Sequence, residues 1–167
     1  MSIYGVSFDL VGKQPIVLLK TAEGNRYLPI WIGHPEAAAI LMKLQGATAP
    51  RPLTHDLLVN MLGELDVEVV RVTVTELREN TFHASITIAQ NGNEVEIDSR
   101  SSDAIAVAVR AHAPIFAADE VIEESAIEFD GEDVNEEEIV DEFKRFLDRV
   151  SAEDFAEAEV EDDDDAT

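Results

Sequence analysis

The chain has 167 residues, of which 36 are Asp or Glu and 12 are Lys or Arg, and its formal net charge at pH 7 is −24. It contains no Cys, which excludes a disulfide scaffold, a cysteine-ligated zinc site and a thiol nucleophile. Hydrophobic residues make up 46% of the sequence, enough for a folded core, and no apolar run approaches the ~18 residues of a membrane span.

Short strands are predicted at the N-terminal end. Residues 2–10, 15–20 and 27–32 are rich in strand-forming residues, and turn-forming residues separate them. Connections of this length favour an antiparallel meander.

Two amphipathic helices are predicted next. Pro35 suits the first position of a helix, and Gly46 suits a left-handed cap at its end. After the stiff linker at residues 49–52, Thr54 is predicted to cap a second helix that closes at Gly63. The apolar positions recur at helical spacing, at Ala37, Ile40, Leu41 and Leu44 in the first helix and at Leu57, Leu58, Met61 and Leu62 in the second.

A second β region follows, with alternating apolar and polar residues. The pairs Glu79-Asn80 and Asn91-Gly92 are predicted to form its turns, and the second pair is a strong hairpin signal. The predicted buried positions are Val70, Val72 and Val74, then Phe82, Ala84, Ile86 and Ile88, then Val95 and Ile97.

A buried helix is predicted after this sheet. Ser101 or Ser102 can cap it, and its body is apolar nearly all round, so we place it deep against the sheet. A short strand at 114–116 and a helical turn at 119–124 complete the series. The predicted fold class is α+β, a mostly antiparallel sheet with helices packed against it.

The last quarter of the chain differs in charge. Residues 126–167 hold 19 acidic and three basic residues, against 17 and nine in residues 1–125. We therefore predict a domain over residues 1–125 and an acidic extension over 126–167, with an amphipathic helix at about 136–150 and a disordered tail at 151–167. The negative field repels phosphates and argues against nucleic-acid binding through a basic patch.

Three motifs resemble the bifunctional nuclease (BFN) domain family. They are LPIWIGHPEAAAI at 28–40, RPLTHDLLVNML at 51–62, and the block from Glu96 to Ala106 that leads through 113–116. The resemblance covers about residues 1–125. It implies an α+β fold, nuclease activity on DNA and RNA, and oligomerisation.

One polar cluster surrounds the start of the second helix. Arg51, His55 and Asp56 fit helix capping, in which Asp56 offsets the dipole and Arg51 pairs with a carboxylate. They also fit an anion site, in which Arg51 clamps a phosphate and His55 serves as general base or metal ligand. The sequence leaves both interpretations open.

A second cluster lies where the last predicted strand of the sheet meets the buried helix. Asp98, Arg100 and Asp103 fit an N-cap with an Arg–Asp pair, or a divalent cation, Mg²⁺ or Mn²⁺, held by Asp98 and Asp103 near Arg100. Glu36 compensates a helix dipole or adds a third acid to that site. The candidate catalytic residues are therefore His55, Asp56, Asp103, Arg100 and Arg51, and the candidate metal ligands are Asp98, Asp103 and Glu36.

Two functions compete at this point. One is a metal-assisted nuclease that binds nucleic acid weakly and in a salt-sensitive way. The other is a non-catalytic interaction or regulatory protein whose acidic extension binds a protein partner. In both cases we predict a homo-oligomer, with a dimer favoured. The sequence start lacks a basic n-region and a long apolar h-region, so we predict no membrane association and a cytoplasmic location.

Overall fold

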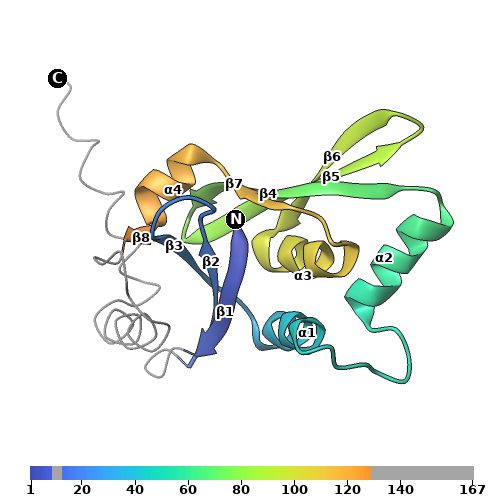
Figure 1. Ribbon diagram of the computed structural model, residues 1–167, viewed down its shortest axis with the longest axis horizontal. Helices are drawn as coiled ribbons and strands as arrows, with labels where there is room; N and C mark the ends of the chain where they lie inside the picture. The colour runs from blue at the N-terminus through green and yellow to red at the C-terminus, as the bar shows by residue number, and fades with distance from the viewer. Residues whose placement is uncertain (9–12, 129–167) are drawn as a thin grey trace.

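Two four-stranded sheets and four helices make up the part of the chain that the computed structural model describes, residues 1–8 and 13–128 (Figure 1). The first sheet has the order β1-β2-β3-β8, formed by Ser2–Phe8, Pro15–Lys20, Arg26–Trp31 and Ile127–Glu128. The second has the order β6-β5-β4-β7, in which β4 is Glu68–Arg78, β5 is Thr81–Gln90, β6 is Asn93–Arg100 and β7 is Ile115–Ala117. The helices are α1 (His34–Leu44), α2 (Thr54–Glu64), α3 (Ser101–Ala111) and α4 (Asp119–Ser125).

The α+β prediction is confirmed. All strand pairs are antiparallel except β4 with β7, which pair in parallel because α3 intervenes between β6 and β7 and returns the chain to the other edge of the sheet. β8 pairs with β3, so the folded unit extends past residue 125 to at least Glu128. The extension's predicted helix and tail lie outside the described residues.

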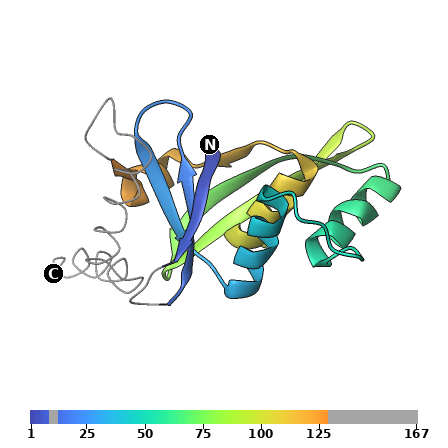
Figure 2. The ribbon, with the colours of Figure 1, turned by 60° about the horizontal axis from the view of Figure 1, so that its bottom comes forward.

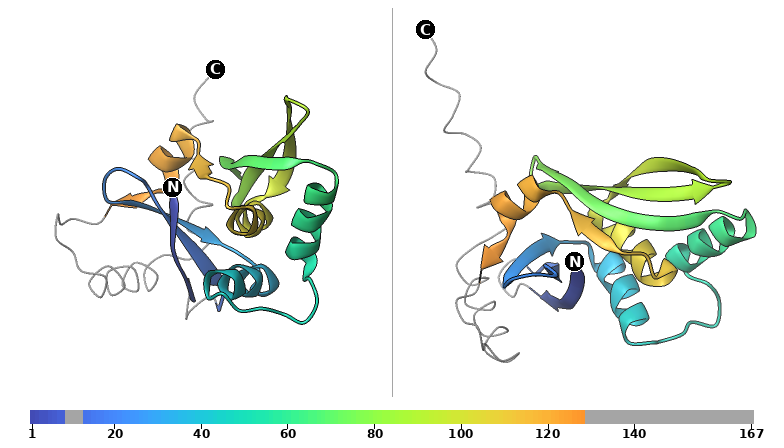
Figure 3. Two further views of the ribbon diagram at one scale, coloured as in Figure 1. Left: turned by 45° about the vertical axis from the view of Figure 1, so that its right-hand side comes forward. Right: turned by 45° about the horizontal axis from the view of Figure 1, so that its top comes forward.

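α3 lies at the centre of the core. Ile105, Ala106 and Val107 are fully buried, as the apolar body of this helix predicts. α3 contacts β4, β5 and β6 on one side and α1 and α2 on the other. Figure 2 and Figure 3 show the result, with α3 between the second sheet and α1, and with α2 at the end of the molecule opposite β8.

The two predicted turns of the second sheet form as expected. Asn91 and Gly92 have φ angles of 51° and 80°, and Glu79 and Asn80 have 48° and 58°. Positive φ at both central residues is the condition for the tight hairpin turn that matches strand twist.

The predicted caps of α2 and α3 are wrong. Leu53 occupies the N-cap position of α2, and Thr54 is its first residue. Asp56 provides the cap instead, because its Oδ2 accepts the Leu53 N–H at 2.9 Å. At α3 the N-cap is Arg100, and both predicted serines lie inside the helix.

Three other predictions fail for reasons of tertiary structure. Val95 and Ile97 lie opposite Ile88 and Ile86, on the face that α3 covers, but they are 56% and 43% exposed. The hairpin of β5 and β6 extends past the neighbouring helices, so nothing among the described residues covers them (Figure 1).

The register shift between Val69 and Arg71 buries Val69 instead of Val70. α2 continues through Gly63 to Glu64, and Asp66 takes the positive φ after it.

Candidate functional site

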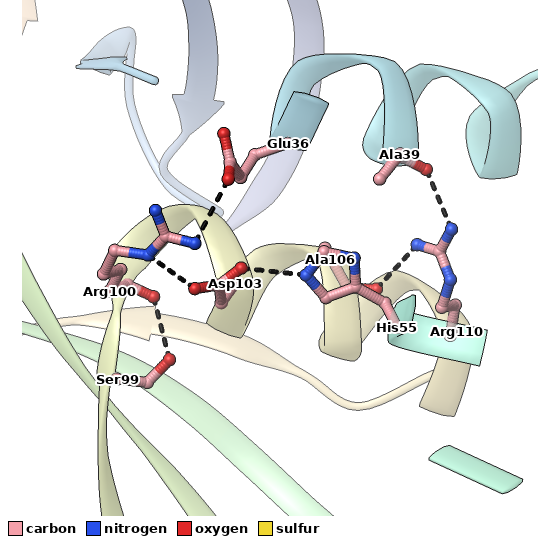
Figure 4. A network of polar contacts seen from close by, with 8 residues as sticks. All are labelled: Glu36, Ala39, His55, Ser99, Arg100, Asp103, Ala106 and Arg110. Carbon is pink, nitrogen blue, oxygen red and sulfur yellow. Dashed lines mark hydrogen bonds and ion pairs between the residues drawn. The ribbon is translucent and has the colours of Figure 1, made fainter. Parts of the chain in front are cut away.

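Side chains from three helices form a continuous polar network (Figure 4). Glu36 projects from α1, His55 from α2, and Arg100 and Asp103 from the start of α3. The Nε of Arg100 donates to Asp103 Oδ2 at 2.6 Å, and its Nη2 donates to Glu36 Oε1 at 3.1 Å. The Nε2 of His55 lies 2.9 Å from Asp103 Oδ1. These contacts bring residues 36, 55, 100 and 103 together.

The network lines a cavity of about 550 Å³, between α1, the segment before α2 and the start of α3. Its walls consist of Pro35, Glu36, Ala38, Ala39, Met42, Pro52, Leu53, Thr54, His55, Arg100 and Asp103. Small-molecule sites occupy about 300–1,000 Å³ and combine apolar walls with a few polar groups. The cavity therefore has the size and lining of a binding site.

Asp103 is held in its charged form. Burial alone would raise the pKa of Asp103, but the hydrogen bonds and positive charge of Arg100, together with the hydrogen bond to His55, lower it below its usual value. The hydrogen bond to Asp103 also raises the pKa of Arg100. An ionised Asp103 is a strong acceptor and favours the His55 tautomer that carries its proton on Nε2. The lone pair of that tautomer lies on Nδ1.

Arg100 keeps donors for a ligand. A guanidinium carries five N–H groups, and the two bonds described use two of them. Its side chain is 64% exposed at the cavity, whereas that of Glu36 is 14% exposed. Arg100 is therefore positioned to accept an incoming anion.

Asp56 belongs to a neighbouring contact. The Leu53 N–H and a hydrogen bond from Arg110 lower the pKa of Asp56 against the effect of burial. Arg110 donates from Nε to Asp56 Oδ1 at 2.6 Å, from Nη1 to the Ala106 carbonyl at 2.9 Å and from Nη2 to the Ala39 carbonyl at 3.0 Å. Because Arg110 holds its carboxylate, Asp56 supports the site and does not line the cavity.

Two predicted site residues lie elsewhere. Asp98 is exposed on β6 opposite Ser85, and it does not line the cavity. Arg51 is exposed before α2 and is also absent from the cavity wall. An ion pair is the role that the sequence favours for Arg110, and the structure confirms it. The sequence does not reveal its partners, since an Arg in an apolar helix body has no local indication of them.

The three predicted metal ligands do not all lie at the cavity. Glu36 and Asp103 both face one guanidinium, and Asp98 is not with them. Within residues 1–8 and 13–128, no group of three or more His, Cys, Asp or Glu side chains could hold a metal ion. As placed, the donor set does not fit the predicted cation, because Mg²⁺ and Mn²⁺ prefer several oxygen ligands.

The chain is similar to known proteins both within one domain and over nearly its full length. The family model of the bifunctional nuclease domain matches residues 17–130. An uncharacterized protein of Mycobacterium tuberculosis is 38% identical over 159 residues, which cover 92% of this chain and 95% of that protein.

Plant proteins match over a shorter region. Bifunctional nuclease 1 of Oryza sativa subsp. japonica is 29% identical over 103 residues, or 59% of this chain and 31% of the rice protein. Bifunctional nuclease 1 of Arabidopsis thaliana is 29% identical over 105 residues, or 60% of this chain and 32% of that protein. The matched region spans about a third of these plant proteins. Among the described residues, no helix is long and apolar enough to cross a membrane.

Proposed function

The chain belongs to the bifunctional nuclease domain family, and from this premise we propose that it hydrolyses phosphodiester bonds of DNA and RNA in the cavity beside His55. The observation that carries the proposal is the 2.9 Å contact between His55 Nε2 and Asp103, next to the exposed Arg100. A base, a group that orients it and an arginine at one cavity can together promote the hydrolysis of a phosphodiester bond.

In this proposal each residue has one role. Asp103 orients the imidazole, and His55 Nδ1 takes the proton of the attacking water. Arg100 binds the phosphate and stabilises the charge that develops on its oxygens. Glu36 fixes Arg100 from the opposite side. The bond between phosphorus and the leaving oxygen then breaks, and the leaving oxygen takes a proton from solvent.

Weak, salt-sensitive binding of short or single-stranded substrates follows from the charge. The net charge of −24 opposes any polyanion, and Arg100 supplies the cation at the cavity. The cavity also suits a few nucleotides better than a duplex. We therefore propose single-stranded RNA and DNA as the substrate class.

The decisive experiment measures cleavage of single-stranded RNA and DNA oligonucleotides by His55→Gln. Gln places an amide nitrogen near the position of Nε2, so it keeps a donor to Asp103 and removes the base. General-base catalysis contributes about 10²–10⁴-fold, so we expect kcat to fall by at least about 100-fold. His112→Gln, at the other end of α3 and not on the cavity wall, is the matched control. Equal trace activity in all three proteins would identify contamination and contradict the proposal.

The cation stays a prediction, and the same assay tests it. The reaction is measured with EDTA and with added Mg²⁺ or Mn²⁺. Activity that requires the added ion would support the cation predicted from the sequence. Activity that survives EDTA without loss would contradict it.

We also propose that the chain acts as a homodimer in the cytoplasm, as the sequence predicts. Size-exclusion chromatography with light scattering tests the assembly, and a monomer at all accessible concentrations would contradict it. Cell fractionation tests the location.

A further inference from the structure

Exposed apolar side chains gather on one side of α2. Leu57, Leu58, Met61 and Leu65 are 52%, 42%, 53% and 61% exposed. At 100° per residue, these four positions fall within an arc of about 100° on the helix surface. No residue of α2 is buried. We call this surface, residues 57, 58, 61 and 65, the α2 stripe.

The rest of α2 already has contacts that fix its orientation. His55 contacts Asp103, and Asp56 contacts Arg110. Val59 and Leu62 pack in part against the core. Because these contacts hold one side of the helix to the domain, the exposed α2 stripe lies on the other side of the helix. Figure 3 shows α2 itself at one end of the molecule.

Four large apolar side chains on a short helix need cover. Contiguous apolar patches on soluble proteins mark interaction sites, whereas single exposed apolar residues are common. The α2 stripe carries no charge, in a chain of net charge −24. An apolar contact surface lets two copies of so acidic a chain meet without placing like charges against each other.

The charges beside the α2 stripe are complementary to those of a second, antiparallel copy of α2. Arg51 precedes α2, whereas Glu64 and Asp66 lie at its other end, and all three are exposed. An antiparallel pair of α2 helices places Arg51 of each copy near the acidic end of the other. The helix dipoles then also oppose each other favourably. A parallel pair would bring like charges together.

We propose that the α2 stripe is the contact surface for a second copy of this chain, with the two α2 helices antiparallel about a twofold axis. A twofold axis lets one apolar patch bury itself against its own copy. The contact also fixes the helix that carries His55. The proposal rests on the homodimer proposed above and does not depend on the proposed nuclease activity. A dimer that survives Met61→Glu would overturn the surface and leave the homodimer standing.

The absence of Cys from the sequence permits a direct test on the full chain. Met61 lies midway along the α2 stripe, so Met61→Cys brings two thiols together at the axis. Mild oxidation is expected to give a disulfide-linked dimer on a non-reducing gel. Asn60→Cys, exposed on the same helix but outside the α2 stripe, is the matched control. Equal cross-linking of both variants would indicate random collision and overturn the proposal.

Light scattering on the full chain gives a second test. We expect a dimer in the wild type and at least about a 30-fold higher dissociation constant in Met61→Glu, since residues at the centre of an interface dominate binding. Phe116→Glu, a 48% exposed position on β7, should remain dimeric. A monomeric wild type, or a dimer that survives Met61→Glu, overturns the proposal. If residues 129–167 of the same chain cover the α2 stripe, the wild type is a monomer, and that result also overturns it.

Charge exchange tests the antiparallel orientation. Arg51→Glu and Glu64→Arg should each weaken the dimer several-fold, because each places like charges across the contact. The double variant restores opposite charges and should recover most of the lost affinity. Two additive losses without recovery would contradict the antiparallel arrangement.

Discussion

The Nε of Arg110 lies 2.6 Å from Asp56 Oδ1, and this hydrogen bond joins the end of α3 to the first turn of α2. The Arg110 side chain is 4% exposed and bonds to α1, α2 and α3 through three nitrogens. The three helices that line the cavity therefore share one buried cation.

Replacing Arg110 is expected to destabilise the whole domain. Arg110→Met keeps much of the side-chain volume but leaves two carbonyls and a carboxylate without their donor. Each buried group left without its hydrogen bond costs about 1–3 kcal/mol. Because the partly exposed Asp56 can form hydrogen bonds with water instead, we expect the free energy of unfolding to fall by about 2–4 kcal/mol. Urea unfolding, followed by the fluorescence of the single Trp, Trp31, measures it.

Arg71 provides the comparison. Its ion pairs with Glu94 and Glu96 are at the surface, and surface pairs contribute about 0–1 kcal/mol. We therefore expect Arg71→Met to change stability little. Equal losses in the two variants would show that the Arg110 bonds have no special weight.

Stability should depend on pH through Asp56. The pKa of Asp56 is lower in the folded chain than in the unfolded chain. Its carboxylate therefore stabilises the fold above the unfolded value of about 3.9, and that contribution is lost as the pH falls through the lower folded value. We expect Asp56→Asn to cost about 1–3 kcal/mol at pH 7, because Asn can still accept the Leu53 N–H but lacks the charge that pairs with the buried Arg110. Urea unfolding at pH 7, 5 and 3 should show this difference shrinking at the lowest pH, and a difference that stays constant would contradict the assignment.

Asp103→Asn tests the orienting role of Asp103 in the proposed reaction. Asn can still contact His55 and Arg100, but it lacks the charge that fixes the imidazole tautomer. We expect kcat to fall by about 100-fold or more, with a smaller change in KM, because the lost interaction acts mainly in the transition state. Steady-state cleavage assays measure both constants. A change confined to KM would make Asp103 a binding residue instead.

Two glycines should respond to Ala in opposite directions. Gly46 has a φ of +66°, where a side chain is strained, so Gly46→Ala should cost about 1 kcal/mol. Gly63 lies inside α2, and a Cβ there meets nothing within 4 Å. Gly63→Ala should therefore raise the free energy of unfolding by about 0.5–1 kcal/mol. Thermal or urea unfolding of both variants gives the comparison. A stabilised Gly46→Ala would contradict the conformational argument.

Local signals explain what the sequence predicted well. The turn at Asn91-Gly92 depends on residues that tolerate positive φ, so it is readable without knowledge of the rest of the fold. The burial of α3 is also readable from a local pattern, because its body is apolar nearly all round. Glu36, Arg100 and Asp103 were recognisable because each lies near a helix start or a strand end.

Tertiary structure decides the rest. Val95 has the pattern of a buried strand residue, and only the absence of a covering helix among the described residues exposes it. Asp98 is next to the cluster in sequence, but the β6 register places it opposite Ser85 and away from the cavity wall. Arg110 needs partners on three helices, and no local pattern reports such distant contacts.

The pairing of β8 with β3 has a consequence during synthesis. β3 ends at Trp31 and its neighbour begins at Ile127, so the last strand of the first sheet leaves the ribosome long after the strand it joins. At about 5–20 residues per second, this delay is roughly 5–20 s. Throughout it the β3 edge of the nascent sheet lacks the strand that pairs with it in the folded domain.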